Sequence, residues 1–410
     1  MLNQNGEREL AYVVLIDGIE PIPGYDRVET AIVGGWHVIV QKGQFKVGDP
    51  AIYFEIDSKV PSNRECFAFL EKRKYKIKTL KMCKTISQGL LMHAEDFGWK
   101  ISPTNSSNTE PIGIIDDKGN YHNIDGESRF LTKELGVTYA DDEDNQRKAP
   151  SVDKYKKMAQ RHPTIFKKAW ARWLMKHAWG RKLMFIFFGK KKDKKNGWPS
   201  WVQKTDEERI ENMPFVLQNK NPWIVTEKVD GSSCTFTMKR GKFKKKDFYV
   251  CSRNVCFDSI DKPCYYDINI YWEMAQKYNM YEVLSKLLDE MPSTEWLTIQ
   301  CEIFGESVQR NTYGLSGREI RVFNLITSDK GRWNSCDMKN LLENGFGIPC
   351  VPILDAQYIL PDTIEELRAY VNSQPSTING EIKEGIVCRS PDGIHSFKCV
   401  SPEYLLKYHS

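Results

Sequence analysis

The stretch WIVTEKVDGSSCTF, at residues 223–236, places a lysine at the end of an apolar, strand-like run and a turn directly after it. Asp230 lies two residues beyond Lys228, so the two side chains face the same side of an extended strand. Gly231 lets the backbone turn close to a ligand because it has no Cβ. Lys228 is therefore either a structural charge at a strand end or a reactive amine.

A lysine acts as a nucleophile only when part of its amine population is unprotonated. Apolar neighbours and nearby cations lower the pKa of a lysine, so the position of Lys228 predicts a lowered pKa. Taken by itself, the short pattern K-x-D-G also arises by chance in unrelated chains, and a structural charge explains it better. The choice depends on the rest of the chain.

The composition indicates a globular, intracellular protein. The chain has 410 residues, enough for two or three domains, and 28% of them are charged. Its longest strongly apolar run, residues 183–189, is too short to span a bilayer, and the polar N-terminus lacks the apolar core of a secretory signal. The eleven cysteines form no CxxC pair and show no Cys/His spacing typical of structural zinc. We expect reduced thiols, a cytoplasmic or nuclear location, no membrane partner and a monomer.

The positive charge is concentrated in one segment. Residues 166–195 hold eleven Lys or Arg residues against one acid, whereas the remainder of the chain is net acidic. A basic segment beside an acidic body favours a polyanionic partner, although a solvated linker helix fits the charge equally well.

The N-terminal part predicts an all-β module. Residues 8–92 contain short apolar or alternating runs separated by Gly, Pro and Asp turns, which fits a small barrel such as the OB-fold. Within it, residues 73–92 alternate Lys with Ile, Leu and Met, which predicts a strand with a cationic face. Residues 101–163 are polar and predict an excursion and linker, with a short helix near LTKELG.

The C-terminal part predicts a mixed α/β domain. A basic, aromatic helix is expected at 164–188, with tryptophans that pack rather than stack on bases, and the capping-box pattern of Thr205 and Glu208 predicts a further helix. From Pro214 onward the pattern predicts a hairpin, one long helix and several strands, at 223–254, 268–290, 296–304, 320–327, 384–389 and 394–400. The expected domains are a barrel module at 1–150, a linker at 151–213 and a catalytic domain at 214–410.

Five further strand-like runs follow Lys228, and each carries charged or aromatic residues that a nucleotide site would use. They are CSRN (251–254), QCEIFGES (300–307), IRVFNLI (320–326), KEGIVCR (383–389) and SFKCV (396–400). This ordered series resembles the six collinear motifs of the covalent nucleotidyltransferase superfamily, which comprises ATP-dependent ligases and mRNA capping enzymes. The six motif positions in this chain are Lys228, Arg253, Glu302, Phe323, Glu384 and Lys398.

Within that superfamily the chain resembles RNA ligases. EKVDG, the SRN triplet, and FK followed by SPEYLLKY look like the ligases that seal 3′-OH and 5′-phosphate ends. DNA ligases and capping enzymes carry the OB domain after the catalytic domain, whereas the candidate barrel here comes first. That order resembles RNA ligase family 5, over residues 8–92 and 200–410. Many relatives carry a second motif lysine where this chain has Val400, and Lys383 or Lys407 is a candidate replacement.

The resemblance implies an α+β fold: an N-terminal OB-type β-barrel, a basic helical linker and a C-terminal mixed α/β nucleotidyltransferase domain, ATP-grasp-like, with antiparallel sheets. It also implies a mechanism. Lys228 attacks ATP to form lysyl-AMP, the AMP passes to an RNA 5′-phosphate, and the RNA 3′-OH then displaces the AMP.

The resemblance further implies roles for individual residues. Asp230, Glu302 and Glu384 would hold Mg²⁺ or Mn²⁺, mainly through water, because these ions prefer oxygen ligands. Glu302 would alternatively bind the ribose. The other expected contacts to the nucleotide or to RNA are adenine stacking by Phe323, phosphate binding by Arg253 and Lys398, and contacts from Glu227 and Gly231.

Three alternatives stay open. A capping guanylyltransferase would use the same lysine chemistry with GTP, although the domain order argues against it. A non-catalytic RNA-binding relative would keep the fold, but such a protein usually loses one of the motif residues, and all are present. The motifs alone do not distinguish RNA sealing from DNA nick sealing.

Overall fold

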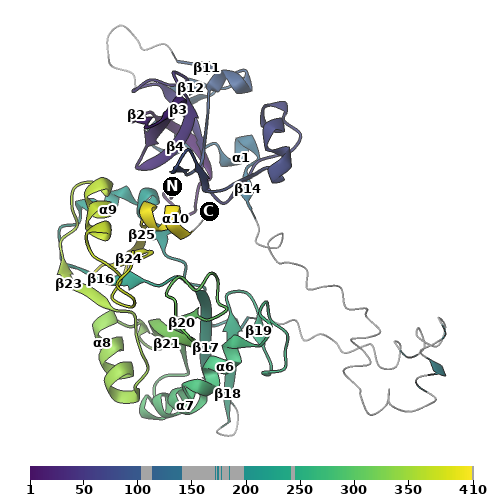
Figure 1. The fold of residues 1–410 in the computed structure, drawn as a ribbon, viewed down its shortest axis with the longest axis vertical. Coiled ribbons are helices and arrows are strands. Elements are labelled where there is room, and N and C mark those ends of the chain that lie inside the picture. Colours follow the sequence, from purple (N-terminus) through teal and green to yellow (C-terminus); the bar gives the residue numbers. More distant parts are fainter. Residues whose placement is uncertain are drawn as a thin grey trace.

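The structure is a computed structural model that describes residues 1–102, 113–140, 198–241 and 245–408, together with residues 171, 173, 174, 177 and 184. The N-terminal sheets lie at one end of the long axis and the C-terminal sheets at the other (Figure 1). Almost all of the basic helix expected at 164–188 lies outside the described residues. The fold class, an OB-type β domain followed by a mixed α/β domain with mainly antiparallel sheets, is as the sequence predicts.

Residues 1–140 form small antiparallel sheets around two hydrophobic cores. Strand β1 (Ala11–Leu15) buries both of its faces, because Ala11 and Val13 pack in one core while Tyr12 and Val14 pack in the other. This explains the unbroken apolar run at that position. The sheets are β1–β5–β10, β2–β3–β4, β14–β6–β7, β11–β12–β13 and β8–β9. Their further bounds are β2 (Gly18–Ile22), β3 (Tyr25–Val33), β4 (Trp36–Gln41), β5 (Pro50–Phe54), β6 (Ser58–Lys59), β11 (Lys100–Ile101), β12 (Gly113–Ile115), β13 (Tyr121–Asn123) and β14 (Thr138–Tyr139). The helix predicted near LTKELG is α1 (Thr132–Leu135).

The single cationic strand predicted at 73–92 is wrong. The segment is broken into four short strands, β7 (Lys76–Ile77), β8 (Leu80–Met82), β9 (Thr85–Ser87) and β10 (Leu90–Met92). Positive φ angles at Lys74 and Tyr75 precede β7, and those at Cys83 and Lys84 turn the chain between β8 and β9. Lys76 is buried, so the alternating lysines do not share one exposed face. Lysines and apolar residues alternate here across short strands and turns. An alternation with a period of two does not distinguish this arrangement from one continuous strand.

The larger C-terminal sheet has six strands, in the order β19–β18–β17–β20–β21–β22. Its strands are β17 (Ser232–Arg240), β18 (Lys246–Ser252), β19 (Cys256–Phe257), β20 (Trp296–Gly305), β21 (Arg318–Thr327) and β22 (Gly331–Arg332). Helices α6 (Ile270–Lys277) and α7 (Met280–Glu290) pack their apolar residues against it. The sequence predicts one helix over 268–290, but Asn279 takes a left-handed conformation, with φ of 48°, and divides it. Helix α8 (Ser335–Lys339) continues as a π-helical segment, Asn340–Asn344.

The smaller C-terminal sheet has five strands, in the order β15–β25–β24–β16–β23. Its strands are β15 (Glu208–Arg209), β16 (Trp223–Lys228), β23 (Ile353–Tyr358), β24 (Gly385–Arg389) and β25 (Ser396–Val400), and α9 (Ile364–Ser373) packs against it. The helix predicted from Thr205 and Glu208 is wrong, because Glu208 and Arg209 pair in parallel with Phe397 and Lys398 of β25. A tertiary partner thus overrides the local capping pattern.

The two C-terminal sheets are joined by one short crossing. Residue Lys228 ends β16 in the smaller sheet, and Ser232 begins β17 in the larger sheet. The quoted stretch therefore holds the point where the chain passes between the sheets.

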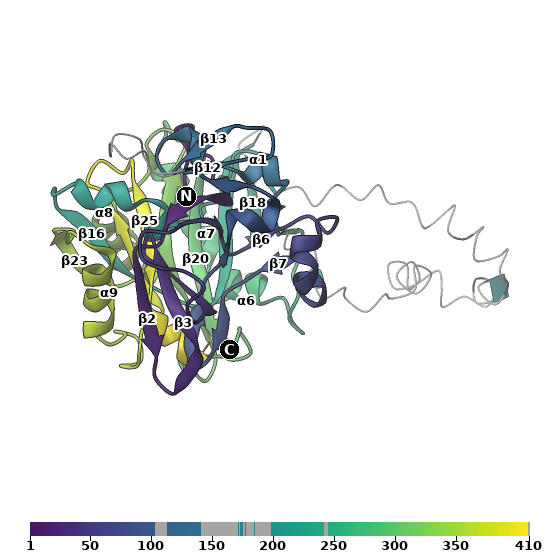
Figure 2. The same ribbon diagram turned by 90° about the horizontal axis from the view of Figure 1, so that it is seen from above.

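The N-terminal domain contacts the smaller sheet and its helices. Arg368 of α9 donates to the carbonyl of Gly35 at 2.6 Å, and Lys81 donates to the carbonyl of Leu406 in α10 (Pro402–Tyr408) at 2.6 Å. Viewed along the long axis, the N-terminal strands lie over the C-terminal sheets (Figure 2). The two domains are thus packed on one another through α9 and α10.

Candidate active site

The position of Lys228 is set by close backbone packing on both sides. Gly385 pairs with Lys228, and a Cβ at Gly385 would lie 2.2 Å from the carbonyl oxygen of Cys399. A Cβ at Gly231 would lie 2.1 Å from the carbonyl oxygen of Ile303 in β20. Only glycine fits at either place. The close approach expected of Gly231 is therefore made to a neighbouring strand of the protein, which holds the crossing against β20.

Lys228 forms an ion pair at this junction. Its Nζ lies 2.7 Å from each carboxylate oxygen of Glu384, and both side chains are largely shielded from solvent. Burial alone would lower the pKa of Lys228, but the attraction of Glu384, followed by that of Glu302 and Asp230, raises it. The lowered pKa predicted for Lys228 from the sequence is therefore wrong for the protein without bound ligands. The acids that outweigh burial are distant in sequence, so the local pattern does not show them.

Three carboxylates surround this one amine. Burial, with repulsion from Glu384 and Asp230, raises the pKa of Glu302 to about 8, although Lys228 and Arg253 oppose the shift. Glu302 therefore favours its protonated form, and a bound cation would offset the same crowding of negative charge. Carboxylate oxygens are the ligands that Mg²⁺ and Mn²⁺ prefer, so this donor set fits a divalent cation.

Asp230 is oriented by two tyrosines. The hydroxyl of Tyr404 donates to Asp230 Oδ2 at 2.9 Å, because a carboxylate can only accept. The hydroxyl of Thr312, 2.8 Å away, completes the chain of hydrogen bonds at Tyr404. The backbone N–H of Asp230 donates to the hydroxyl of Tyr313 at 3.0 Å. Tyr404 and Tyr313 were not identified from the sequence as site residues, although Tyr404 lies inside the quoted SPEYLLKY motif.

Lys398 adds a second cation beside Lys228. It lies on β25, in register with Arg209 of β15. Burial, and then repulsion from Lys228 and Arg209, lowers the pKa of Lys398 to about 8. A buried cation that is destabilised by other cations gains most from an anionic ligand, which fits the predicted contact to phosphate.

The other predicted site residues lie around this cluster. Arg253 is exposed and forms an ion pair with Asp206, which is also exposed. Phe323 packs with Val229 in a small apolar cluster beside the crossing. The Glu227 carboxylate accepts from the backbone N–H of Thr377 at 2.9 Å and from the Thr377 hydroxyl at 2.7 Å, and also from Ser376. Glu227 therefore anchors the loop before β24, a contact that no local sequence signal shows.

The position of the missing motif lysine is apolar. Val400 is buried with Ile86 and Leu405, where the N-terminal domain meets α10. Of the two candidate replacements, Lys407 forms an exposed ion pair with Glu381. Lys383 is buried, and its Nζ has no hydrogen-bond partner in the described part of the chain. An anionic ligand would supply that partner, which favours Lys383 over Lys407.

Two family models match the chain. Residues 10–94 match an OB-fold domain, and residues 221–409 match the RNA ligase family. No curated protein sequence matches the chain.

Solved structures of an RNA ligase from Naegleria gruberi resemble the whole chain. One holds pyrophosphate and covers 98% of this chain and 99% of its own, at 26% identity and a TM-score of 0.62. A variant with ATP and manganese covers 98% of this chain and 100% of its own, at 26% identity and a TM-score of 0.63. A variant with AMP and manganese covers 98% of this chain and 99% of its own, at 26% identity and a TM-score of 0.63.

These matches confirm the resemblance to RNA ligases and the order of an OB-fold before the catalytic domain.

Among the described residues, none of the helices has both the length and the apolar character needed to cross a membrane.

Proposed function

We propose, on the premise that residues 221–409 belong to the RNA ligase family, that this protein is an ATP-dependent ligase that seals 3′-OH and 5′-phosphate RNA ends through lysyl-AMP. One observation carries the proposal. Lys228 lies at the junction of two sheets, with its amine bonded to Glu384, among further carboxylates and beside the cation of Lys398.

In the first step the unprotonated Nζ of Lys228 attacks the α-phosphorus of ATP. An N–P bond forms, the bond from the α-phosphorus to the bridging oxygen breaks, and pyrophosphate leaves with the electron pair. The amine must give up a proton first, so the ion pair with Glu384 has to loosen when substrate binds. In the second step the AMP passes to the RNA 5′-phosphate, and in the third the RNA 3′-OH displaces AMP.

Asp230, Glu302 and Glu384 would hold the divalent cation, Mg²⁺ or Mn²⁺, largely through water. A bound cation would neutralise charge on the carboxylates and on the phosphates, which is the main requirement of phosphoryl transfer. It would also weaken the electrostatic hold of the acids on the Lys228 proton. The solved neighbour with ATP and manganese supports this choice of nucleotide and cation.

The remaining residues would position the substrates. Lys398 would bind phosphate, and Arg253 would bind the phosphate of ATP or of the RNA end in exchange for its exposed ion pair with Asp206. Phe323 would stack on adenine from the apolar cluster at Val229. Glu227 on β16 and Gly231 in the crossing would shape the nucleotide site, and Glu302 would alternatively bind the ribose. We further propose that the chain acts as a monomer with domains at 1–150 and 214–410, joined by 151–213.

Intact mass spectrometry after incubation with ATP and Mg²⁺ tests the proposal. We expect one covalent AMP per chain, lost in Lys228→Ala and retained in the matched surface control Lys220→Ala. Lys220 is a suitable control because it pairs with exposed Asp362, away from the carboxylate cluster. An adduct that survives in Lys228→Ala would refute the assignment.

Parallel incubations separate the alternatives. An adduct formed from GTP but not from ATP would indicate a capping guanylyltransferase, and the absence of any adduct would indicate a non-catalytic RNA-binding protein. Sealing of nicked RNA compared with nicked DNA would decide the polymer.

A further inference from the structure

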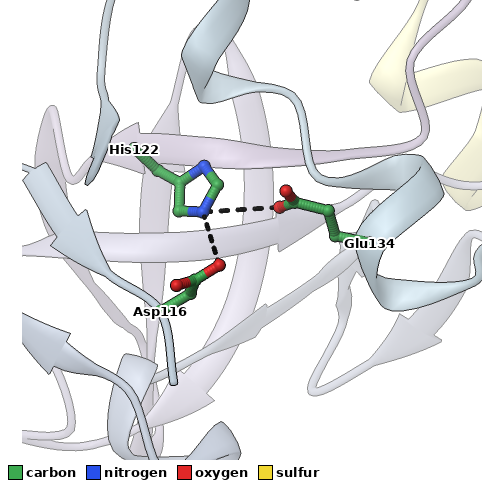
Figure 3. Close-up of side chains that lie close together, drawn as sticks. All are labelled: Asp116, His122 and Glu134. Atoms are coloured by element: carbon green, nitrogen blue, oxygen red, sulfur yellow. Dashed lines mark hydrogen bonds and ion pairs between the residues drawn. The ribbon is translucent and has the colours of Figure 1, made fainter. Parts of the chain in front are cut away.

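The N-terminal domain holds a second cluster of possible metal ligands, far in sequence from Lys228. Asp116 follows β12, His122 lies on β13 and Glu134 lies on α1 (Figure 3). One ligand atom from each side chain lies within 4.8 Å of the others. Asp116 and His122 are buried, whereas Glu134 is partly exposed, so the cluster opens to solvent on one side.

The tautomer of His122 is set by its surroundings. The Nδ1 atom lies 2.9 Å from the carbonyl oxygen of Ser128, which can only accept, so Nδ1 carries a proton. In the neutral ring, Nε2 then presents a lone pair. Nε2 lies 3.4 Å from Asp116 Oδ2 and 3.4 Å from Glu134 Oε2. These contacts are ion pairs when the ring is protonated, and they direct the lone pair at both carboxylates when the ring is neutral. A neutral imidazole therefore has no donor to offer in a buried place that holds only acceptors.

Asp116 is held as an anion in a fixed orientation. Its Oδ1 accepts from the backbone N–H groups of Lys118 and Asn120 at 2.9 and 2.7 Å, and its Oδ2 accepts from the Asn120 side chain at 2.8 Å. Trp99 stacks on the His122 ring, with centroids 5.8 Å apart and planes 16° apart.

The distances match those between ligands of a small divalent cation. Metal bonds to His nitrogen and carboxylate oxygen are about 2.0–2.2 Å for Zn²⁺, and a tetrahedron with bonds of about 2.1 Å has edges of about 3.4 Å. The ring is also held as it is in many metal sites, where the ligating His donates its other N–H to a backbone carbonyl. Imidazole among the donors favours a transition metal over Mg²⁺.

We propose that Asp116, His122 and Glu134 form a binding site for one divalent transition-metal ion, with Zn²⁺ as the best match. Water would complete the tetrahedron from the side where Glu134 is exposed. The site is separate from the proposed nucleotide site, and the ion has a structural role. It joins the β12–β13 hairpin to α1, which is itself fixed to β1 by the bond from the Leu131 N–H to the Ala11 carbonyl at 2.8 Å.

The test uses the full-length protein, stripped with a chelator and then equilibrated with a small excess of Zn²⁺ over protein. Glu134→Gln is the principal variant because Glu134 is partly exposed, and His122→Gln is the second. Asp116 is left intact because it closes the 116–120 turn. Exposed Glu95 is in the same domain, so Glu95→Gln is the matched control.

We expect the wild type and Glu95→Gln to retain one more Zn²⁺ per chain after gel filtration than either variant, measured by elemental analysis. Loss of a direct ligand should weaken the affinity for Zn²⁺ at least about tenfold, since even residues that only support a ligand change metal affinity by about 10–100-fold. The difference between variants removes any Zn²⁺ held at the catalytic carboxylates. Zn²⁺ should also raise the thermal midpoint of the wild type more than that of Glu134→Gln.

Equal Zn²⁺ content and equal thermal shifts in all four proteins would overturn the proposal. So would nitrogen NMR of the stripped protein at pH 8 that shows both His122 nitrogens protonated and unchanged by Zn²⁺. That result would make the cluster an imidazolium bridging two carboxylates. Circular dichroism of each variant confirms that a lost ion does not reflect a lost fold.

Discussion

Removing the Tyr404 hydroxyl tests whether Asp230 must be held in place for adenylate transfer. Tyr404→Phe deletes one oxygen from a ring that is 1% exposed, so the packing of α10 is kept. The variant loses the hydrogen bond to Asp230 at 2.9 Å and leaves the Thr312 hydroxyl without its partner at Tyr404. The substitution thus removes the hydrogen bonds of one hydroxyl and acts on the orientation of the Asp230 carboxylate.

The size of the effect follows from the bond that is lost. A hydrogen bond to a charged group contributes about 1.5–3 kcal/mol. At about 1.36 kcal/mol per factor of ten, the rate of lysyl-AMP formation should fall by about 10- to 150-fold if the bond matters fully in the transition state. The upper value holds only if the freed carboxylate finds no other donor.

Single-turnover formation of the labelled lysyl-AMP adduct measures this rate. Tyr408→Phe is the matched control, because Tyr408 lies in the same helix and its ring centroid is 4.7 Å from that of Tyr404. Because the bond positions a carboxylate that we propose to bind the metal, the defect should become smaller at high Mn²⁺, which a merely structural role would not produce. A wild-type rate in Tyr404→Phe, or an equal loss in Tyr408→Phe, would refute the reasoning.

Four further predictions test the same site. Glu302, with a pKa of about 8 without metal, is largely protonated at neutral pH, so Mn²⁺ binding in the presence of ATP should release a proton and tighten from pH 7 to 9. Calorimetry in two buffers of different ionisation enthalpy measures the release. Glu302→Gln should release fewer protons than the wild type, because only the proton that Lys228 gives up remains. The same raised pKa means that the metal-free protein binds more protons folded than unfolded, so its stability should fall as pH rises from about 4.5 to 8, with a smaller slope in Glu302→Gln. Gly231→Ala places a Cβ 2.1 Å from the Ile303 carbonyl oxygen and should abolish lysyl-AMP formation. The control Gly345→Ala, whose Cβ has no neighbour within 4 Å, should leave adduct formation intact. Comparable activity in both variants would show that the close approach at Gly231 is no constraint. Arg253→Ala should reduce sealing strongly while changing the free energy of unfolding by about 0.5 kcal/mol or less, because the side chain is exposed; a large loss of stability in urea titration without a sealing defect would make it a structural charge.

The motif residues and most of their elements could be predicted from the sequence. Lys228, Asp230 and Gly231 lie in one short stretch. The strands that carry Glu302, Phe323 and Lys398, and the strand that begins directly after Glu384, were placed within a few residues. These elements are long, apolar and bounded by turns, so their local pattern agrees with their tertiary environment. The order of an OB-type domain before the catalytic domain was equally visible, because each domain carries its own pattern.

Local patterns failed where a distant partner decides the conformation. Glu208 and Arg209 form a strand because β25 lies beside them, although their own sequence favours a helix start. The lysines of 73–92 are divided between short strands and the turns beside them, two of which place lysines at positive φ, and alternation in the sequence does not reveal this.

The sequence by itself determined which residues are present for adenylate transfer and the order in which they occur, because chemistry depends on residue type and the motifs are collinear. Only the tertiary structure decided the charge state and the surroundings of those residues. The amine of Lys228 meets Glu384, 156 residues away, and this pairing raises a pKa that the apolar strand alone would lower. The triad of Asp116, His122 and Glu134 likewise exists only because a hairpin folds against a helix, since Coulomb forces and metal bonds depend on distance in space and not on position along the chain.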